Sequence, residues 1–468
     1  MIKIFGKTKH IHFIGIGGIG MSGMAEFLLN HNFTITGTDI KESNKIKELK
    51  NKGIDIEIGH SSENKNIRLA DLIVYSSAVK IENPEIKKAK KINIPIIKRA
   101  ELLGELIKIK SISIAIAGTH GKTTTSSMLG NILIQAKLDP ALIIGGIVNN
   151  FNNNNVAGSG DIIVVEADEF DKSFLSLNPT YAIINNLDME HLDSYKNLEE
   201  LQNTFTQFAN SLPFYGVCCI CNDSKNIIEI SKNIKKNIKT FGIKNKSEIM
   251  AKKIVFNKNK SSFQIINYKN EFKPFNVSIN VPGIHNVYNA LAAISIALEL
   301  DIDTRFIKRG LEQYNGVRRR FDIKYSINQP NIMLIDDYAH HPKEIFCTLD
   351  AIKKGWKNKN IIAIFQPHLY SRTKNFYKEF ANSLFQADTI IICDIYGARE
   401  NPIKNVSSEL ITNELKKIKH QNFHYEKNMN NIKTNIKSLL KGEDIIITMG
   451  AGNIHAIIDD LFIAISKL

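Results

Sequence analysis

The amino-acid sequence predicts an α/β protein of three domains with mostly parallel sheets. Its 468 residues correspond to about three domains at roughly 150 residues each. An apolar strand followed by a turn and a helix begins afresh three times, and signals for tight hairpins are few. That alternation is typical of parallel strands covered by helices on both faces. We place the domain boundaries at 1–109, 110–317 and 318–468.

The first domain begins with an apolar strand over 12–16, a glycine-rich turn and a helix over 21–30. A second strand over 33–38 follows, and lysine-rich helical stretches separate short strands over 72–75 and 94–97. Strand, helix and strand in this order form a parallel sheet that binds ligands where its strands end. We therefore expect a Rossmann-like domain.

The central domain follows a helix over 100–109 and restarts the pattern. Its expected elements are a strand over 111–117, a helix ending near 136, buried strands over 161–165 and 181–185, and a helix after Pro282-Gly283. The stretch 244–281 has short β-type runs without a helical pattern, so we expect antiparallel strands appended to the sheet. The asparagine run 152–155 is of low complexity and predicts a flexible loop.

The third domain repeats the alternation of strand and helix, and we expect it to be Rossmann-like as well. Its expected strands cover 332–336, 361–365, 389–393 and 444–449, and its expected helices cover 342–353 and 374–384. A glycine turn, GAGN, follows the last strand. Polar segments after these strands are therefore expected to lie at the edge of the sheet that binds ligands.

The composition excludes several classes of protein. A hydrophobic fraction of 43% with 23% charged residues is typical of folded globular chains. No apolar run approaches the roughly 18–20 residues that span a bilayer, and the N-terminus lacks the cleavage pattern of a signal peptide. We therefore expect a cytoplasmic protein that does not bind membranes and that is a monomer or a homodimer.

The net charge of +14 does not predict binding to nucleic acid. Only nine of the 61 basic residues are arginines, and the lysines are scattered rather than interleaved with aromatic residues. The five cysteines do not indicate a disulfide framework, because three of them crowd at Cys218, Cys219 and Cys221. A zinc site would need a partner cluster, and Cys347 and Cys393 are distant in sequence. We expect structural cysteines in a buried strand.

A glycine-rich turn after the first strand is the first candidate ligand site. Glycines are needed there because the turn is tight and because a diphosphate must approach the backbone at a helix N-terminus. Asp39 ends the second strand, at the position where dinucleotide sites bind a ribose hydroxyl. Taken alone, the motif indicates a nicotinamide dinucleotide, and a turn that only packs closely is the structural alternative. The glycines are Gly15, Gly17, Gly18 and Gly20.

A second glycine-rich segment resembles a P-loop, with an apolar strand before it and a helix after it. In a P-loop the backbone amides hold phosphates, so Lys122 would reach the terminal phosphate oxygens and the Thr123 hydroxyl would bind magnesium. The spacing departs from the general pattern, because Ile116 stands at the first glycine position. The segment comprises Gly118, Thr119, His120, Gly121, Lys122, Thr123 and Thr124.

Acidic residues end two buried strands of the same domain. Glu166 ends one strand, and the segment from Asn186 to His191 follows the next. Carboxylates at this edge of a parallel sheet lie where magnesium meets bound phosphates. A single histidine there is more often structural, but the convergence of three strand ends favours Glu166 and His191 as metal ligands together with Thr123.

Three motifs of the third domain carry candidate contacts. Arg318, Arg319 and Arg320 hold a third of all arginines at a domain junction, which favours planar binding of phosphate or carboxylate over a solvated turn. The segments 336–342 and 366–373 follow two strands and are expected to face the ligand crevice. We interpret their histidines as substrate and nucleotide contacts, because successive residues rarely share one metal ion.

These motifs resemble the Mur ligase family over nearly the whole chain. The resemblance rests, in order, on HFIGIGGIGMSGMAEFL, AGTHGKTTT, VVEADEFDKSFL, NNLDMEHLD, GIHNVYNALAA, GVRRRFD, DDYAHHP and FQPHLYSRT. The departure from the general P-loop spacing is how this family writes that loop. Within the family, the motifs are similar to those of the branch that adds alanine.

The resemblance implies an ATP-dependent ligase of peptidoglycan precursor synthesis, with ATP and Mg2+ as cofactors. Such an enzyme joins L-alanine to the lactyl carboxylate of UDP-N-acetylmuramate through an acyl phosphate. By similarity, the first domain binds the UDP-sugar with its diphosphate on the glycine turn, and the central domain binds ATP. The third domain closes over both ligands and admits alanine.

The resemblance also implies roles for individual residues. His285 and Asn289 would contact the nucleotide, and Asp337 would position ATP from the third domain. The implied catalytic residues are Lys122, Glu166, His191, Arg320, His340 and Arg372. The implied substrate-binding residues are Gly15, Gly17, Gly18, Gly20, Asp39, His340, His368 and Arg372.

Several sibling ligases carry a carbamylated lysine after the magnesium histidine. Here that place falls near Thr206, and no lysine occurs between Lys196 and Lys225, which agrees with the alanine-adding branch. Three alternatives remain: a murein peptide recycling ligase, which joins a preformed peptide to the same nucleotide sugar, a nucleotide-regulated binding protein, and a nicotinamide enzyme. The recycling relative usually departs from GIGGIGMSG, and the intact ligase residues argue against a binding protein without turnover.

Overall fold

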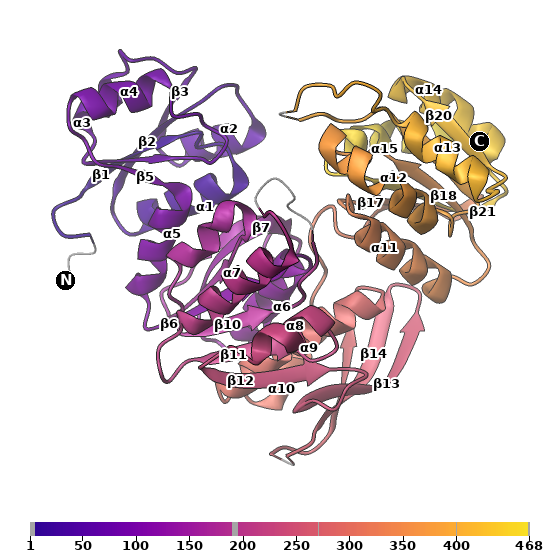
Figure 1. Cartoon of the computed structure of the whole chain (residues 1–468), viewed down its shortest axis with the longest axis horizontal. Helices are drawn as coiled ribbons and strands as arrows, with labels where there is room; N and C mark the ends of the chain where they lie inside the picture. The colour runs from indigo at the N-terminus through magenta and orange to yellow at the C-terminus, as the bar shows by residue number, and fades with distance from the viewer. Residues whose placement is uncertain (1–4, 190–194, 270, 399, 467–468) are drawn as a thin grey trace. The chain divides into compact units, whose positions relative to one another are not determined.

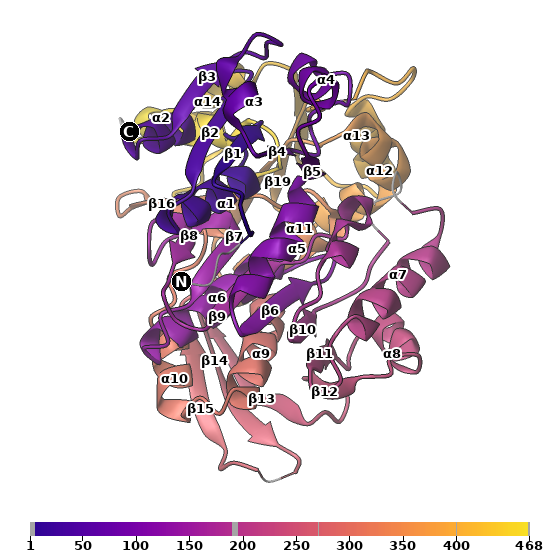
Figure 2. The ribbon, with the colours of Figure 1, turned by 90° about the vertical axis from the view of Figure 1, so that its left-hand side faces the viewer.

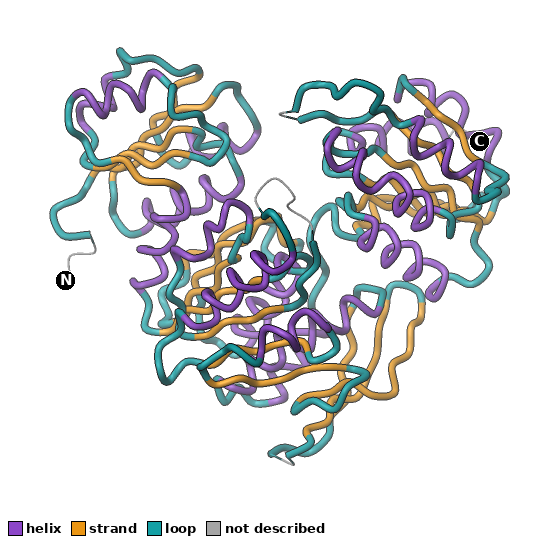
Figure 3. The backbone as a smooth tube through the Cα atoms, viewed as in Figure 1, coloured by secondary structure: helices purple, strands orange, loops and turns teal. Residues whose placement is uncertain are grey.

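The structure is a computed structural model that describes residues 5–189, 195–269, 271–398 and 400–466 (Figure 1). Contacts between residues divide the chain into two compact units. The first unit contains 1–252, 265–275 and 288–311, and the second contains 253–264, 276–287 and 312–468. Strands and helices alternate through most of both units (Figure 3), which confirms the predicted α/β class.

The first sheet has five parallel strands in the order β3-β2-β1-β4-β5, as expected of a Rossmann-like domain. Its strands are β1 His10–Ile14, β2 Thr34–Asp39, β3 Asp55–Ile58, β4 Leu72–Tyr75 and β5 Ile96–Lys98. The helices are α1 Ile19–Asn30, α2 Asn44–Asn51, α3 Lys65–Leu69, α4 Pro84–Lys91 and α5 Arg99–Leu106. Ile67 of α3 and Ile86 of α4 pack with Ile14 and Ile73, so these helices cover one face of the sheet (Figure 2).

Two details of this sheet differ from the sequence prediction. β1 ends at Ile14 rather than at residue 16, because the amides of Gly15 and Ile16 both donate to the carbonyl of Thr38 and the chain turns there. β3 has no counterpart among the predicted strands. It lies at the edge of the sheet and buries only Ile56, so its sequence carries little hydrophobic signal.

The second sheet has ten strands in the order β15-β14-β13-β12-β11-β10-β6-β9-β7-β8. Its strands are β6 Ile112–Ala117, β7 Ala141–Val148, β8 Asn153–Ala157, β9 Ile162–Glu166, β10 Tyr181–Ile184, β11 Val217–Cys221, β12 Asn237–Gly242, β13 Ile249–Asn257, β14 Lys260–Asn267 and β15 Phe275–Ile279. Its helices are α6 Lys122–Gln135, α7 Leu198–Asn210, α8 Lys225–Ser231, α9 Ile284–Glu299, α10 Thr304–Glu312 and the 3-10 helix η2 Phe170–Ser176.

The strands at one end of this sheet depart in part from the antiparallel arrangement that we expected. β12 pairs with β13 in parallel through two residue pairs. The short connection is held by the carboxylate of Asp223, which accepts hydrogen bonds from the amides of Ile243, Lys244 and Asn245. β13 and β14 are neighbours joined by only two residues, and such a connection requires an antiparallel hairpin.

The asparagine run forms part of a strand, so the prediction of a flexible loop there was wrong. β8 pairs antiparallel with β7, with Ile143 opposite Asn155 and Val148 opposite Asn153. Asn154 and Asn155 are buried. Their side-chain amides donate hydrogen bonds to helix α1, a partner that composition alone does not indicate.

The cysteines of β11 are structural, as expected. Cys218, Cys219 and Cys221 are buried in a central strand, and burial raises the pKa of the Cys218 thiol to about 12. Among the described residues, no group of three or more His, Cys, Asp or Glu side chains is placed to hold a metal ion. No helix in the described part of the chain is both long enough and apolar enough to cross a membrane.

The third sheet has six strands in the order β16-β17-β21-β18-β19-β20, all parallel except the edge pair β16–β17. Its strands are β16 Asp322–Ile327, β17 Asn331–Asp337, β18 Asn360–Phe365, β19 Thr389–Cys393, β20 Phe423–Glu426 and β21 Glu443–Met449. Its helices are α11 Pro342–Gly355, α12 Tyr370–Leu384, α13 Glu409–Lys417, α14 Met429–Asn435 and α15 Ile458–Ile465. Separate apolar clusters around Phe365 and Ile364 fill its two faces.

Candidate active site

The turn between β1 and α1 requires its glycines. Gly15 has a φ of +81°, in the left-handed region, and a side chain at Gly17 would place its Cβ 2.9 Å from Oδ2 of Asp39. Asp39 closes the turn, because this oxygen accepts a hydrogen bond from the amide of Gly17 at 2.8 Å. The N-cap of α1, Gly18, makes no side-chain capping hydrogen bond, and an uncapped helix N-terminus after a glycine turn fits a diphosphate.

Arg99 lies beside this turn and was not among the predicted site residues. A side chain at Gly20 would place its Cβ 3.1 Å from Nη1 of Arg99. Nη2 of Arg99 lies 3.6 Å from Oδ2 of Asp168, in the acidic segment after β9. The scarcity of arginine in this chain was the signal that could have indicated it.

The P-loop between β6 and α6 has the backbone that its sequence predicts. Gly118 and Gly121 have φ values of +132° and +83°, and α6 begins at Lys122. A Cβ at Gly121 would lie 2.3 Å from Oδ1 of Asn289, so only glycine fits there. Asn289 thus contacts this loop, where the resemblance implies a nucleotide contact. Thr124 lies in the first turn of α6, and its carbonyl accepts a hydrogen bond from the Ser127 hydroxyl.

The end of strand β10 fixes the P-loop from the other side. The amide of His120 donates to Oδ1 of Asn186 at 2.8 Å, and Nδ2 of Asn186 donates back to the carbonyl of His120 at 2.9 Å. The Thr119 hydroxyl donates to the carbonyl of Asp188. These contacts hold the loop rigid for binding phosphate.

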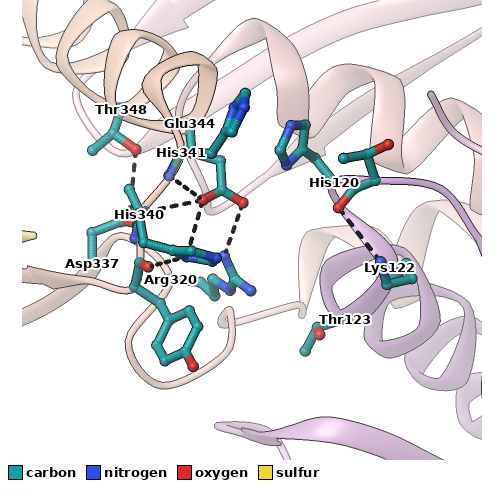
Figure 4. A network of polar contacts seen from close by, with 12 residues as sticks. His120, Lys122, Thr123, Arg320, Asp337, His340, His341, Glu344 and Thr348 are labelled. Carbon is teal, nitrogen blue, oxygen red and sulfur yellow. Dashed lines mark hydrogen bonds and ion pairs between the residues drawn. The ribbon is translucent and has the colours of Figure 1, made fainter. Parts of the chain in front are cut away.

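The ammonium group of Lys122 faces back into the loop (Figure 4). It donates to the carbonyl of Gly118 at 2.6 Å and to Oε2 of Glu169 at 2.7 Å. Glu169 is 1% exposed, so the pair is largely shielded from water. Glu169 was not among the predicted site residues, although it lies in the acidic segment that we had identified.

Thr123 and Glu166 come together as predicted for a magnesium site. The Thr123 hydroxyl donates to Oε2 of Glu166 at 3.1 Å, and the amide of Gly145 donates to Oε1 of Glu166 at 2.7 Å. A hydroxyl and a carboxylate beside a phosphate-binding loop are oxygen donors of the kind that Mg2+ prefers, so these residues fit that ion. His191, the third predicted ligand, lies outside the described residues.

The second unit contains the remaining predicted residues. Arg320 Nη1 lies 3.7 Å from Oε1 of Glu344, and His340 Nδ1 lies 3.3 Å from Oε2 of the same carboxylate (Figure 4). His340 Nδ1 is also within 2.9 Å of the Tyr338 carbonyl. The Arg320 guanidinium lies over the ring of Tyr338 at 5.1 Å. Arg320 and His340 are thus held around one carboxylate.

The neighbouring Arg319 has a structural function. Its Nε lies 3.3 Å from Oδ2 of Asp336, and an Nη2 hydrogen donates to the carbonyl of Gly450 at 2.7 Å. These contacts join the arginine run to the ends of β17 and β21. The carboxylate that Arg319 binds is thus one within its own unit, that of Asp336.

Asp337 is a buried carboxylate at the end of β17. It accepts hydrogen bonds from the amides of Phe321 and Ala339 at 2.8 and 2.7 Å, and from the Thr348 hydroxyl at 3.4 Å. Burial raises the pKa of Asp337 to about 6, against the opposing effect of Arg320. The carboxylate ties the arginine segment to α11, and its predicted contact with ATP stays a prediction.

His285 and His368 occupy turns at the beginning of helices. His285 lies in the first turn of α9, which begins at Ile284 directly after Gly283, whose φ is +95°. Burial lowers the pKa of His285 to about 4. The ring of His368 stacks on Tyr396 with centroids 5.9 Å apart and meets His340 edge-on at 6.0 Å. Arg372 lies in the first turn of α12. The structure therefore brings His340 and His368 together.

Comparison with known proteins assigns all three sheets to one family. Models described as the Mur ligase family catalytic domain, the Mur ligase middle domain and the Mur ligase glutamate ligase domain match residues 10–111, 116–297 and 319–452. A UDP-N-acetylmuramate–L-alanine ligase of Persephonella marina is 45% identical over 456 residues, which are 97% of each chain.

Two solved structures are similar over nearly the whole chain. One is the UDP-N-acetylmuramate-alanine ligase MurC of Thermotoga maritima, with 28% identity, a TM-score of 0.83 and coverage of 98% and 99% of the two chains. The other is a murein peptide ligase of Psychrobacter arcticus, with 26% identity, a TM-score of 0.72 and the same coverage. The family models and the close relatives together show that this chain belongs to the Mur ligase family.

Proposed function

We propose that this chain joins L-alanine to the lactyl carboxylate of UDP-N-acetylmuramate in cytoplasmic peptidoglycan precursor synthesis, using ATP. The observation that carries the proposal is the 45% identity, over 97% of both chains, to a ligase named for this reaction. The glycine turn of α1 supports binding of the sugar diphosphate, and the P-loop supports binding of ATP. We also propose that the chain is divided into domains at 1–109, 110–317 and 318–468.

The reaction proceeds in two transfers. A lactyl carboxylate oxygen attacks the γ-phosphorus of ATP, the bond to the bridging oxygen breaks, and ADP leaves. The amine of L-alanine then attacks the acyl carbon of the resulting acyl phosphate and loses a proton, and inorganic phosphate leaves with the bonding electrons. Water must be excluded meanwhile, because an acyl phosphate is readily hydrolysed.

We propose that Lys122 neutralises negative charge on the phosphoryl group. When the terminal phosphate enters the loop, the ammonium of Lys122 binds it, and the ion pair with Glu169 is either broken or kept beside the phosphate. Thr123, Glu166 and His191 would hold Mg2+, which would supply further positive charge at the phosphate oxygens. Asp39 and the turn glycines bind the UDP-sugar, and His285, Asn289 and Asp337 contact ATP. Arg320, His340, His368 and Arg372 are proposed to hold alanine and the intermediate.

Phosphate release from ATP tests the proposal. We expect release only when UDP-N-acetylmuramate and an amino acid, L-alanine first, are both present, and little release with a preformed tripeptide in place of alanine. A preference for the tripeptide would assign the chain to the peptide-recycling reaction instead. Release that no amine stimulates would contradict the ligase class.

Variants of Lys122 test its role in phosphoryl transfer. Lys122→Ala removes the cation that lies 2.7 Å from the buried Glu169 carboxylate, so both turnover and stability should fall. The double variant Lys122→Ala/Glu169→Gln removes the buried negative charge as well and should recover part of the thermal midpoint without recovering turnover. Lys108→Ala, in an exposed pair with Glu105, is the control and should keep full turnover. Turnover by the double variant would contradict the role of Lys122.

A further inference from the structure

A buried polar cluster connects helix α1 with the β7–β8 hairpin, both within the first unit. On the hairpin side, Nδ2 of Asn154 donates to the carbonyl of Ile19 at 2.8 Å, and Nδ2 of Asn155 donates to Oε2 of Glu26 at 2.9 Å. Asn155 also reaches the carbonyl of Gly23 at 3.3 Å. We call this cluster the α1–hairpin junction, and it comprises Glu26, Lys45, Lys52, Asn153, Asn154 and Asn155.

Glu26 is the centre of the junction. Its side chain is 4% exposed, and its two oxygens lie 2.8 Å from the ammonium of Lys45 and 2.7 Å from that of Lys52. Burial by itself would raise the pKa of Glu26, but the hydrogen bonds from Lys45, Lys52 and Asn155 outweigh it and lower the pKa to about 2. Glu26 is therefore an anion that Lys45, Lys52 and Asn155 hold in place.

The junction holds the first turn of α1 directly. Ile19 is the first residue of the helix, and the glycines from Gly15 to Gly20 form the turn that leads into it. A carbonyl in the first turn of a helix can accept a second hydrogen bond besides the one inside the helix. The side-chain amide of Asn154 donates such a bond to the carbonyl of Ile19. The position of the glycine turn therefore depends on the position of β8.

The other strand of the same hairpin touches the predicted magnesium ligand. The register of β7 and β8 is irregular between Ile143 and Val148, and Gly145 lies in that irregular stretch. Its amide donates to Oε1 of Glu166, and a Cβ at Gly145 would lie 2.8 Å from Oε2 of Glu166. Irregularities of this kind often occur next to active sites, where they redirect the backbone.

We infer that the α1–hairpin junction positions the diphosphate-binding turn relative to the phosphate loop. One rigid hairpin holds α1 at its β8 strand and Glu166 at its β7 strand, so the distance between the two ligand sites is set by these contacts. Glu26, Asn154 and Asn155 are then positioning residues for the transfer between the lactyl carboxylate and ATP. This inference rests on the proposed function, because the two ligands must react with one another.

Kinetics and separate binding measurements test the inference. Asn155→Ala and Glu26→Gln should lower kcat about tenfold or more, because small displacements of reacting groups are costly. Kd for UDP-N-acetylmuramate, measured without ATP, and Kd for a non-hydrolysable ATP analogue, measured without the sugar, should both stay within about twofold. Glu26→Asp, which keeps the charge, should recover part of kcat. Glu105→Gln, in an exposed pair, is the control and should change none of these values.

Hydrogen exchange without any ligand tests the mechanical connection independently of turnover. In Asn155→Ala, amides of 143–148 and of the first turn of α1 should exchange faster than in the wild type, and those of β10 should not. Unchanged kcat in both variants, or losses of kcat matched by equal losses of binding, would overturn the inference. So would unchanged exchange at 143–148. A wild type without turnover would contradict the proposed function, while the exchange measurement would still decide whether the junction connects the two sites.

Discussion

Asp337 shows how burial gives a single residue a measurable effect on stability. Its pKa of about 6 lies above the ordinary value of 3.8, so the native state keeps a proton that the unfolded chain has lost between these pH values. Raising the pH through this window therefore lowers the stability of the second unit. The rise of this pKa from 3.8 to about 6 corresponds to a loss of roughly 3 kcal/mol in the free energy of unfolding.

The comparison of wild type with Asp337→Asn isolates this effect. Asn cannot ionise but loses one acceptor for the amides of Phe321 and Ala339, so the variant should be less stable than the wild type at pH 4. The difference in free energy of unfolding between wild type and variant should narrow by pH 7, where the wild type bears a buried charge. The pKa of His285 is lowered to about 4, so its titration makes both proteins more stable as the pH rises. This contribution is the same in wild type and variant and cancels in the difference between them. Urea unfolding, followed by the fluorescence of Trp356, the single tryptophan, measures this difference in free energy. A difference that does not depend on pH would contradict the role of burial.

Helix α11 shows that a residue predicted to contact a ligand also stabilises an element. His341 is the N-cap of α11, its side chain accepting from the amide of Lys343, and Glu344 accepts in return from the amide of His341. Pro342 occupies the first helical position, where it needs no hydrogen-bond donor. This reciprocal capping box explains why two polar residues stand three positions apart after β17.

Replacement of the cap should therefore change the stability of α11. His341→Ala should lower the free energy of unfolding of the second unit by about 1 kcal/mol, and His341→Ser should recover most of it because serine is a favourable N-cap. Trp356 follows the helix as its C-cap, so its fluorescence reports the unfolding of this element directly. Equal stability of the Ala and Ser variants would show that the side-chain cap does not hold the helix.

The whole molecule consists of two units with separate cores, and this division has a thermodynamic consequence. Trp356 packs with Phe321 in the core of the second unit, at a centroid distance of 5.7 Å. The turn proposed to bind UDP-N-acetylmuramate lies in the first unit. A ligand stabilises the unit to which it binds, by about 2.7 kcal/mol at a concentration of 100 times Kd.

UDP-N-acetylmuramate should accordingly act on one unit more than on the other. We expect it to raise the thermal midpoint measured by far-UV circular dichroism, most of which reports the larger first unit, and to leave the Trp356 transition nearly unchanged. Uridine without the diphosphate should give a smaller shift at equal concentration. A shift of the Trp356 transition equal to that of the circular dichroism would show that the two units unfold as one.

Much of the fold is encoded in local sequence. The alternation of apolar strands with helices predicted three mostly parallel sheets, and the glycine segments predicted both turns, because positive φ values and close backbone approach favour glycine. The predicted limits of β4 and β19 agree with the structure to the residue. β3 was missed because an edge strand with one buried side chain has almost no hydrophobic period.

What the sequence determined by itself is therefore the set of strands, helices and glycine turns, together with the family to which their motifs belong. The tertiary structure decided which partners the polar side chains find. Lys122 meets Glu169 across 47 positions, and Glu26 meets Asn155 across 129, and no local pattern relates such residues. Local geometry follows from neighbours in the chain, whereas a buried charge is satisfied by whichever group the fold brings within hydrogen-bonding distance.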